Sequence, residues 1–180
     1  LPSANSINIS RLIPQAFYYF NAARQLPEGV EPVFVIPSGN FGNLTAGLLA
    51  QSLGLPVRHW VAATNINDTV PRYLANGNYE PLPSTPTISN AMDVGAPSNF
   101  ARMKDLFGDS WESMRENISG LAFDDDETRQ AIRTVKEETG YTIDPHGAVG
   151  YLAAKIWHQA SPEDETIILE TAHPSKFLPT

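Results

Sequence analysis

One segment constrains the fold of this chain more than any other, because a strand pattern, a glycine-rich turn and a helix pattern follow one another without a break. Residues 33–36 are apolar and rich in β-branched side chains, which is typical of a buried strand. The turn occupies 37–43, a helix is predicted at 44–53 before Gly54, and a second strand at 57–63. This order predicts a βαβ unit with parallel strands and a right-handed crossover.

The rest of the chain is predicted to alternate around this unit. Helices are expected at 9–26, 100–107, 125–139 and 147–159, and short strands at 141–143 and 166–170. Prolines punctuate residues 64–99, which predicts a long ordered excursion with a short helix near 70–76. The expected fold class is therefore α/β, as a three-layer αβα domain with a mostly parallel sheet.

The first of these helices has a clear apolar spacing and one irregularity. Its predicted apolar face comprises Ile9, Leu12, Ile13, Ala16, Phe17 and Phe20. Pro14 falls inside this pattern, and it is expected to kink the helix or to mark a later start.

Composition narrows the classes of function. The chain has 180 residues, of which 42% are hydrophobic, and this suits one globular domain. A net charge of -8 argues against a nucleic-acid partner. The absence of cysteine excludes disulfides and thiolate metal sites, and the four histidines do not form a metal-binding pattern. Neither a signal peptide nor a membrane-spanning run is recognisable, so a cytoplasmic protein is expected.

The glycine-rich turn is also the strongest candidate for a binding site. Gly39 and Gly42 allow the backbone to approach a ligand closely, and the following helix presents unpaired N–H groups to an anion. A P-loop would need Gly-Lys-Ser/Thr, but Gly42 is followed by Asn43 and Leu44. A dinucleotide site would need a third glycine and an acidic residue at the end of the next strand. The pattern favours a single phosphate group, with an ordinary turn as the alternative.

The turn and five further blocks together resemble one enzyme family. The blocks are Asn5–Arg11, Ser38–Asn43, Ala63–Arg72, Ser89–Val94, Ile143–Gly150 and Glu170–Phe177. In this order they are similar to threonine synthases, which have the tryptophan-synthase-like (type II) fold of pyridoxal-phosphate (PLP) enzymes. The resemblance implies that 1–180 is the C-terminal part of the PLP-binding large domain, with 64–99 as an excursion. It also implies that an N-terminal half, which bears the Schiff-base lysine, is absent from this chain.

The resemblance implies a reaction for the parent enzyme. O-phospho-L-homoserine and water would give L-threonine and phosphate, with PLP as the electron sink. Two alternatives stay open: another type II PLP enzyme such as a threonine or serine dehydratase, and a non-catalytic anion-binding module. The Asn-Phe pair inside the turn and the Thr-Ala-His-Pro segment speak against a dehydratase.

Roles for individual residues follow from the same resemblance. The cofactor phosphate would be held by Gly39, Asn40, Phe41, Gly42 and Asn43, mainly through backbone N–H groups. Thr171 would face the pyridine nitrogen. The residues expected near the substrate are Asn5, Ser6, Asn8 and Arg11. No metal ligand is assigned, and no catalytic residue, because the family's Schiff-base lysine lies in a block that this chain does not contain.

Several other residues suit ordinary structural roles. Lys104, Lys136 and Lys155 have the spacing of surface charges, and Lys176 follows the Thr-Ala-His-Pro segment. Asp144 and His146 are interpreted mainly as cap and turn residues. His173 could line the pocket or be structural. The acidic run 124–127 is interpreted as a helix start rather than a metal site.

Overall fold

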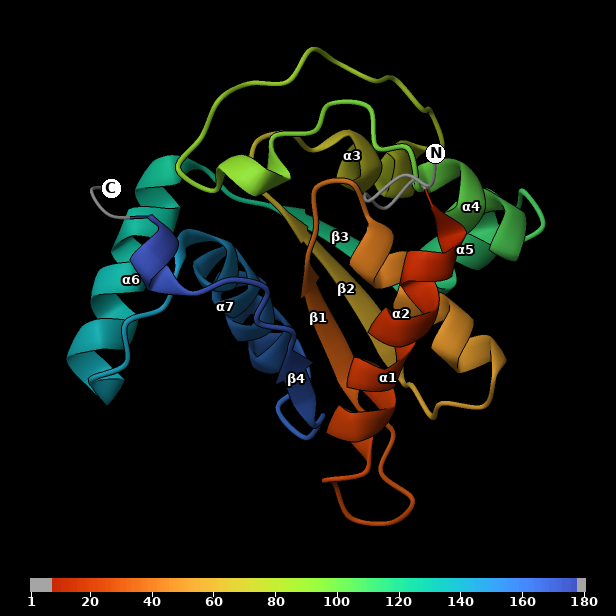
Figure 1. Cartoon of the computed structure of the whole chain (residues 1–180), viewed down its shortest axis with the longest axis horizontal. Coiled ribbons are helices and arrows are strands. Elements are labelled where there is room, and N and C mark those ends of the chain that lie inside the picture. The colour runs from red at the N-terminus through yellow and green to blue at the C-terminus, as the bar shows by residue number, and fades with distance from the viewer. Residues whose placement is uncertain (1–7, 178–180) are drawn as a thin grey trace.

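A computed structural model describes residues 8–177 of the chain, and these residues form an α/β fold. Within this range the sheet has four strands in the order β3-β2-β1-β4. They are β1 (Val33–Pro37), β2 (His59–Thr64), β3 (Ile118–Ala122) and β4 (Thr166–Ile168). Every neighbouring pair is parallel, and Val33 pairs with His59 on one side and Thr166 on the other. The predicted parallel sheet is therefore confirmed (Figure 1).

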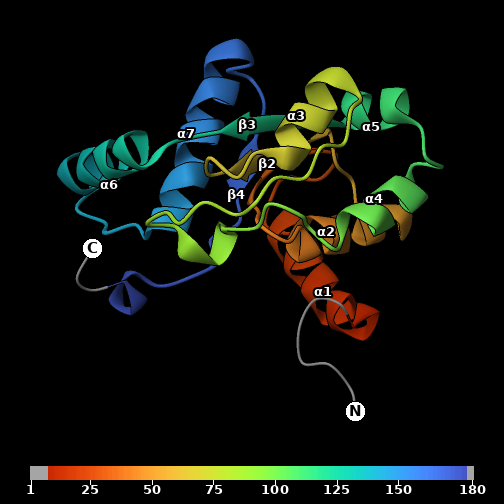
Figure 2. The same cartoon turned by 90° about the horizontal axis from the view of Figure 1, so that it is seen from above.

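Helices cover both faces of this sheet. They are α1 (Leu12–Ala23), α2 (Gly42–Ser52), α3 (Thr69–Asn76), α4 (Phe100–Leu106), α5 (Trp111–Asn117), α6 (Asp125–Thr139) and α7 (Pro145–Ala160). Short 3-10 helices are η1 (Ile9–Arg11), η2 (Asn90–Met92) and η3 (Pro174–Lys176). Figure 2 shows α6 and α7 on the opposite side of the sheet from α1 and α2, which is the predicted three-layer arrangement. In the described part of the chain, no helix is both long and apolar enough to cross a membrane.

The central strand explains this layering, because its side chains alternate between two cores. Phe34 and Ile36 are buried in the core that α1 and α2 cover. Val33 and Val35 are buried in the second core, to which α7 contributes. A strand that is buried on both faces carries a continuous apolar run, which is the pattern the sequence shows at 33–36.

The first helix differs in part from the prediction. It opens with the turn η1, and α1 begins at Leu12, so Pro14 lies in the first helical turn, where its missing N–H costs little. The predicted apolar face is partly wrong, because Ile13 and Phe17 are 61% and 65% exposed whereas Tyr19 is fully buried. Since α1 carries apolar side chains on two faces, periodicity alone does not identify the face that meets the core.

Two other predictions on the elements need correction. The described structure has no strand at 141–143, where the chain links α6 to α7. Ile143 is nevertheless buried between these two helices, which explains its apolar character. Conversely, α5 and the edge strand β3 were not predicted, because Ser119 and Gly120 are weak strand formers. A Cβ on Gly120 would lie 2.6 Å from Pro71 Cα, so glycine lets α3 pack closely on this strand.

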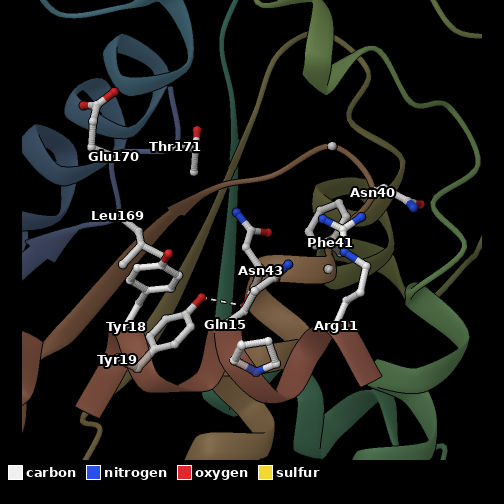
Figure 3. Close-up of a pocket in the computed structure, with 13 residues that line it drawn as sticks. Arg11, Gln15, Tyr18, Tyr19, Asn40, Phe41, Asn43, Leu169, Glu170 and Thr171 are labelled. Atoms are coloured by element: carbon white, nitrogen blue, oxygen red, sulfur yellow. Dashed lines mark hydrogen bonds between the residues drawn. The ribbon is translucent and has the colours of Figure 1, made fainter. Parts of the chain in front are cut away.

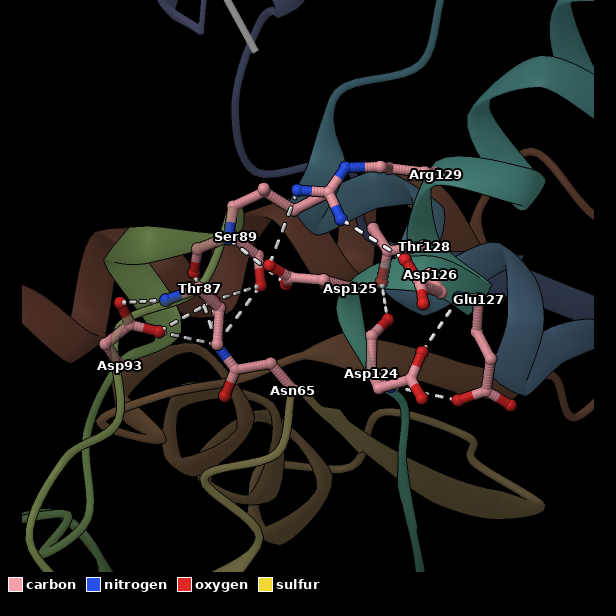
Figure 4. A network of polar contacts seen from close by, with 11 residues as sticks. Asn65, Thr87, Ser89, Asp93, Asp124, Asp125, Asp126, Glu127, Thr128 and Arg129 are labelled. Atoms are coloured by element: carbon pink, nitrogen blue, oxygen red, sulfur yellow. Dashed lines mark hydrogen bonds and ion pairs between the residues drawn. The ribbon is translucent and has the colours of Figure 1, made fainter.

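The excursion 64–99 is ordered by a partly buried polar network (Figure 4). Asn65 Nδ2 donates to Asp93 Oδ1 at 2.8 Å and to Thr87 Oγ1 at 2.8 Å. The Thr87 N–H donates to Asp93 Oδ2 at 3.0 Å, and the Ile88 N–H reaches Asp125 Oδ1 at 3.2 Å. This network ties the excursion both to the end of β2 and to the start of α6.

The acidic run 124–127 begins α6, as predicted. The Glu127 N–H donates to Asp124 Oδ1 at 2.8 Å, and the Asp124 N–H donates to Glu127 Oε2 at 2.9 Å. These reciprocal bonds form a capping box, and the remaining acidic side chains lie where the helix dipole favours negative charge.

Candidate functional site

The glycine-rich turn lies at the carboxyl end of β1, where open α/β sheets bind their ligands. The Ser38 N–H donates to the Ala63 carbonyl at 2.8 Å, so pairing with β2 continues into the turn before α2 begins at Gly42. A cavity of about 710 Å³ adjoins the turn. Its walls come from the turn, from η1 and α1, and from residues 169–171 after β4 (Figure 3). This volume falls within the usual range of small-molecule sites.

Two residues fix the backbone path of the turn. Phe41 adopts a left-handed conformation with φ 60°, which is uncommon for a residue other than glycine, and its side chain is only 2% exposed. Its carbonyl accepts hydrogen bonds from the N–H and Oγ1 of Thr45 at 3.0 and 2.6 Å. Gly39 is required for a steric reason, because a Cβ there would lie 2.6 Å from Met92 Cα. The turn is therefore held by hydrogen bonds to α2 and by close packing against Met92, and it leaves no room for a side chain at position 39.

The two asparagine side chains of the turn serve its own structure. Asn40 Oδ1 accepts from the N–H and Oγ of Ser98 at 2.6 and 3.0 Å, which ties the turn to the excursion. Asn43 Nδ2 donates to the Pro37 carbonyl at 2.7 Å, and its Oδ1 accepts from Ser38 Oγ at 3.1 Å. Because these side chains are engaged and the Leu44 N–H already donates to Asn43 Oδ1 at 2.9 Å, the groups best suited to an anion are the backbone N–H groups of residues 39–43.

Helix α1 supports the turn through a residue that the sequence prediction missed. Tyr19 is fully buried, and its hydroxyl donates to the Asn43 carbonyl at 2.6 Å. Burial raises the pKa of Tyr19 far above its usual value, so the phenol keeps the proton that it donates. The spacing of Leu12, Ala16 and Tyr19 is the signal that could have identified this face.

Most of the predicted binding residues meet at one cavity. The five residues 39–43, Thr171 and Arg11 all line it. Figure 3 shows Arg11 extending from η1 toward the turn and Thr171 on the opposite wall. Asn8 is not part of that lining as residues 8–177 define it, and its side chain accepts from the Ser10 N–H at 3.1 Å. Asn5 and Ser6 lie outside the described residues. The binding roles of all these residues stay predictions.

A second cavity of about 310 Å³ adjoins the other side of the turn. It shares Gly39, Asn43 and Thr171 with the first cavity, and it is also lined by His146 and Lys176. The sequence analysis did not place His146 or Lys176 at a cavity, although both residues belong to blocks that resemble the family. His173 does not line either cavity in the described structure. It accepts from the Ser175 N–H at 3.2 Å at the start of η3, which is a structural role.

Asp144 begins α7 beside this second cavity, and its role as a helix cap is confirmed. Its Oδ1 accepts from the His146 N–H at 2.9 Å and lies 2.7 Å from His146 Nδ1. Burial alone would raise the pKa of Asp144, but hydrogen bonds from His146 and Glu170 hold it well below its usual range.

Glu170 has the opposite tendency. Glu170 is exposed over part of its surface, but partial burial, followed by the hydrogen bond and charge of Asp144, raises the pKa of Glu170 to about 8. Within residues 8–177, Asp144 Oδ2 is buried and has no hydrogen-bond partner, and the carboxyl group of Glu170 can donate to Asp144 only when it is protonated. The raised pKa of Glu170 and the lowered pKa of Asp144 therefore favour a proton on Glu170 and a negative charge on Asp144.

This pair predicts a specific pH dependence of stability. Between the ordinary pKa of a glutamate and about 8, the unfolded chain gives up the Glu170 proton while the native chain keeps it. The contribution of Glu170 to the free energy of unfolding therefore falls as pH rises through this window, and the loss is complete above it. Glu170→Gln keeps a donor and does not ionise, so its melting temperature relative to the unchanged chain should rise with pH. Thermal melts from about pH 5 to 9 measure this difference.

The matched control is Glu163→Gln, which removes an exposed carboxylate from the same part of the chain. Its melting temperature should follow that of the unchanged chain at every pH. Parallel curves for Glu170→Gln and the unchanged chain would show that Glu170 ionises normally.

Comparisons with known proteins agree with this geometry. The family model described as "Pyridoxal-phosphate dependent enzyme" matches residues 4–170. A threonine synthase of Escherichia coli (strain K12) is 51% identical over 179 residues, which are 98% of this chain and 41% of that protein. A crystal structure of threonine synthase from Escherichia coli superposes with a TM-score of 0.89 and 49% identity, covering 98% of this chain and 41% of that chain.

A PLP-bound threonine synthase from Brucella melitensis is a further structural match. Its TM-score is 0.88 at 34% identity, over 98% of this chain and 43% of that one. The chain therefore spans about two fifths of the length of the relatives that it matches.

Proposed function

Because the chain belongs to the family of pyridoxal-phosphate dependent enzymes, we propose that it forms the cofactor-phosphate side of the active site of a threonine synthase. The parent enzyme converts O-phospho-L-homoserine and water into L-threonine and phosphate. The similarity to threonine synthases over 98% of the chain supports this reaction. PLP is the family's cofactor, and when bound it supplies an electron sink for the substrate.

The turn 38–43 is the observation that carries the cofactor assignment. Its backbone leaves no space for a Cβ at Gly39, and the next residues open α2 with N–H groups directed along the helix axis. These features suit a phosphate group, because it accepts several hydrogen bonds and is stabilised by the positive end of the helix dipole. The chain's own donors therefore fit the phosphate end of PLP.

Thr171 and Arg11 complete the proposed site. Thr171 lines both cavities, so its hydroxyl is available to the nitrogen edge of a pyridine ring whose phosphate lies at the turn. Arg11 presents a guanidinium to the larger cavity, where it suits the phosphate of the substrate. Asn5, Ser6 and Asn8 precede Arg11 in sequence, and we assign them to the same substrate-binding segment.

We also propose that a preceding part of the parent enzyme closes this site and carries the cofactor-binding lysine. The relatives are more than twice as long as this chain. Beside the larger cavity, α1 exposes Ile13, Phe17 and Tyr18 by 61%, 65% and 67%. Exposed apolar side chains that cluster next to an open cavity suit a contact with another part of the same polypeptide.

Titration with inorganic phosphate tests the cofactor site without any need for catalysis. Backbone amide NMR signals of residues 39–43 are expected to shift with saturable dependence on phosphate, because their N–H groups bind it. Chloride at matched ionic strength is the control, and it should leave these signals in place. Phosphate-dependent shifts that avoid residues 39–43 would refute the site.

Product analysis of the parent enzyme separates this function from a dehydratase. A threonine synthase forms threonine and phosphate from O-phospho-L-homoserine, whereas a dehydratase releases ammonia from L-serine or L-threonine. Ammonia release without threonine formation would support the alternative.

A further inference from the structure

His146 is a buried side chain that the proposed function does not use. It is the second residue of α7, its ring is 2% exposed, and it lines the smaller cavity together with Gly39 and Thr171. The ring also packs against Phe177, with 4.9 Å between the ring centroids. The residue therefore connects α7, the C-terminal segment and the wall of the site.

Both ring nitrogens of His146 are engaged, and this fixes which of them carries the hydrogen. The Ala91 N–H donates to Nε2 at 3.2 Å, so Nε2 is an acceptor and bears no hydrogen. Nδ1 then bears the hydrogen and donates it to Asp144 Oδ1 at 2.7 Å. Because Asp144 caps α7, the two hydrogen bonds of the imidazole link the start of that helix to Ala91.

Ala91 belongs to η2, which lies directly against the turn. A Cβ at Gly39 would lie 2.6 Å from Met92 Cα and 3.0 Å from the Ala91 carbonyl oxygen. The partly buried network around Asp93 anchors the segment after η2, with Asn65 Nδ2 donating to Asp93 Oδ1 at 2.8 Å. On the α7 side, the bond to His146 Nε2 links η2 to the helix.

We propose that His146 is a positioning residue of the phosphate site, whose Nε2 holds η2 against Gly39 and so keeps the turn in its binding shape. This inference rests on the proposed function of residues 39–43 as a phosphate site. The effect on the ligand is indirect, because His146 acts on η2, and η2 limits how far the backbone at Gly39 can move.

Two substitutions distinguish the role of the Nε2 acceptor from the role of the rest of the His146 side chain. His146→Asn keeps a donor near the Nδ1 position for Asp144 but is too short to accept from Ala91. His146→Gln is longer and places its amide oxygen near the Nε2 position. In His146→Asn, loss of one hydrogen bond should speed hydrogen exchange of the Ala91 amide about tenfold. Affinity for inorganic phosphate should fall roughly three- to tenfold, since less of the protein has the binding shape. His146→Gln should keep most of the slow hydrogen exchange at Ala91 and most of the phosphate affinity of the unchanged chain.

The outcomes keep this inference separate from the proposed function. If the unchanged chain binds no phosphate, the proposed site fails, while hydrogen exchange at Ala91 still tests the contact. Equal exchange rates and affinities in His146→Asn and the unchanged chain would overturn the inference. Equal losses in both variants would overturn it too, because packing or capping would then explain them.

If His146→Asn does not fold, Ala91→Pro tests the same contact from the other side. This change removes the donor N–H and leaves His146 intact, and the Ala91 side chain is exposed, so the proline ring has space. A roughly three- to tenfold loss of phosphate affinity is expected again. Unchanged affinity in Ala91→Pro would contradict the inference.

Discussion

Incubated with PLP and O-phospho-L-homoserine, this chain by itself is expected to release no phosphate and to form no threonine. PLP chemistry requires a lysine that holds the cofactor covalently and moves protons. Lys104 and Lys136 are engaged away from the site, with Asp109 Oδ1 at 2.9 Å and the Gly140 carbonyl at 2.8 Å. A phosphate-release assay, together with amino-acid analysis, measures this loss, and the full parent enzyme is the positive control.

Lys176 is the residue that most directly challenges this expectation, because it lines the smaller cavity. Thr171 lines that cavity too, and we assign Thr171 to the nitrogen edge of the pyridine ring, opposite the aldehyde edge where a lysine would react. Lys176→Arg should therefore behave like the unchanged chain. A borohydride-trapped PLP adduct that maps to Lys176, accompanied by threonine formation, would disprove the expectation.

Adding the preceding part of the parent enzyme as a separate polypeptide should restore activity if α1 provides its docking surface. Phe17→Ser removes an exposed apolar side chain, so it should weaken this restoration without lowering the stability of the chain itself. If the preceding part carries no cofactor-binding lysine, the chain is better explained as a non-catalytic anion-binding module.

Gly39→Ala is expected to have the largest effect of any single methyl group in the site. The new Cβ would lie 2.6 Å from Met92 Cα, and the obstructing atoms are backbone, so η2 or the turn has to move. Such overpacking should lower the free energy of unfolding by about 1–3 kcal/mol. Phosphate affinity should fall at least about tenfold, because the displaced backbone carries the N–H groups that are proposed to bind the phosphate. Thermal melts and phosphate titration measure the two effects.

Gly29→Ala is the matched control for this substitution. It also replaces a glycine in a segment that flanks β1, four residues before the strand begins, but a Cβ there meets nothing within 4 Å. Gly29 has φ 86°, so alanine should cost about 1 kcal/mol of stability through backbone strain. Its phosphate affinity should not change. Equal phosphate affinities in both variants would show that close packing at Gly39 does not shape the site.

The sequence alone determined the central βαβ unit and the place of the glycine-rich turn. A continuous apolar run, two glycines and a following helix pattern lie within some thirty residues, and each is a local signal for its element. Because parallel strands end at a common edge, the position of the turn at the carboxyl end of β1 followed from this order. The capping box of α6 was predictable for the same reason, since its partners are three residues apart.

The tertiary structure decided what depends on residues distant in the sequence. Periodicity predicted a face of α1 that is partly exposed, and only packing against the sheet buried Tyr19, whose hydroxyl reaches Asn43 across 24 residues. The contact between Ala91 and His146 spans 55 residues, and no local pattern indicates it. The raised pKa of Glu170 likewise depends on burial and on the carboxyl group of Asp144, which belongs to another element. Local sequence indicates the elements with strong patterns, but burial and hydrogen bonding between elements decide the others and set the shape of the site.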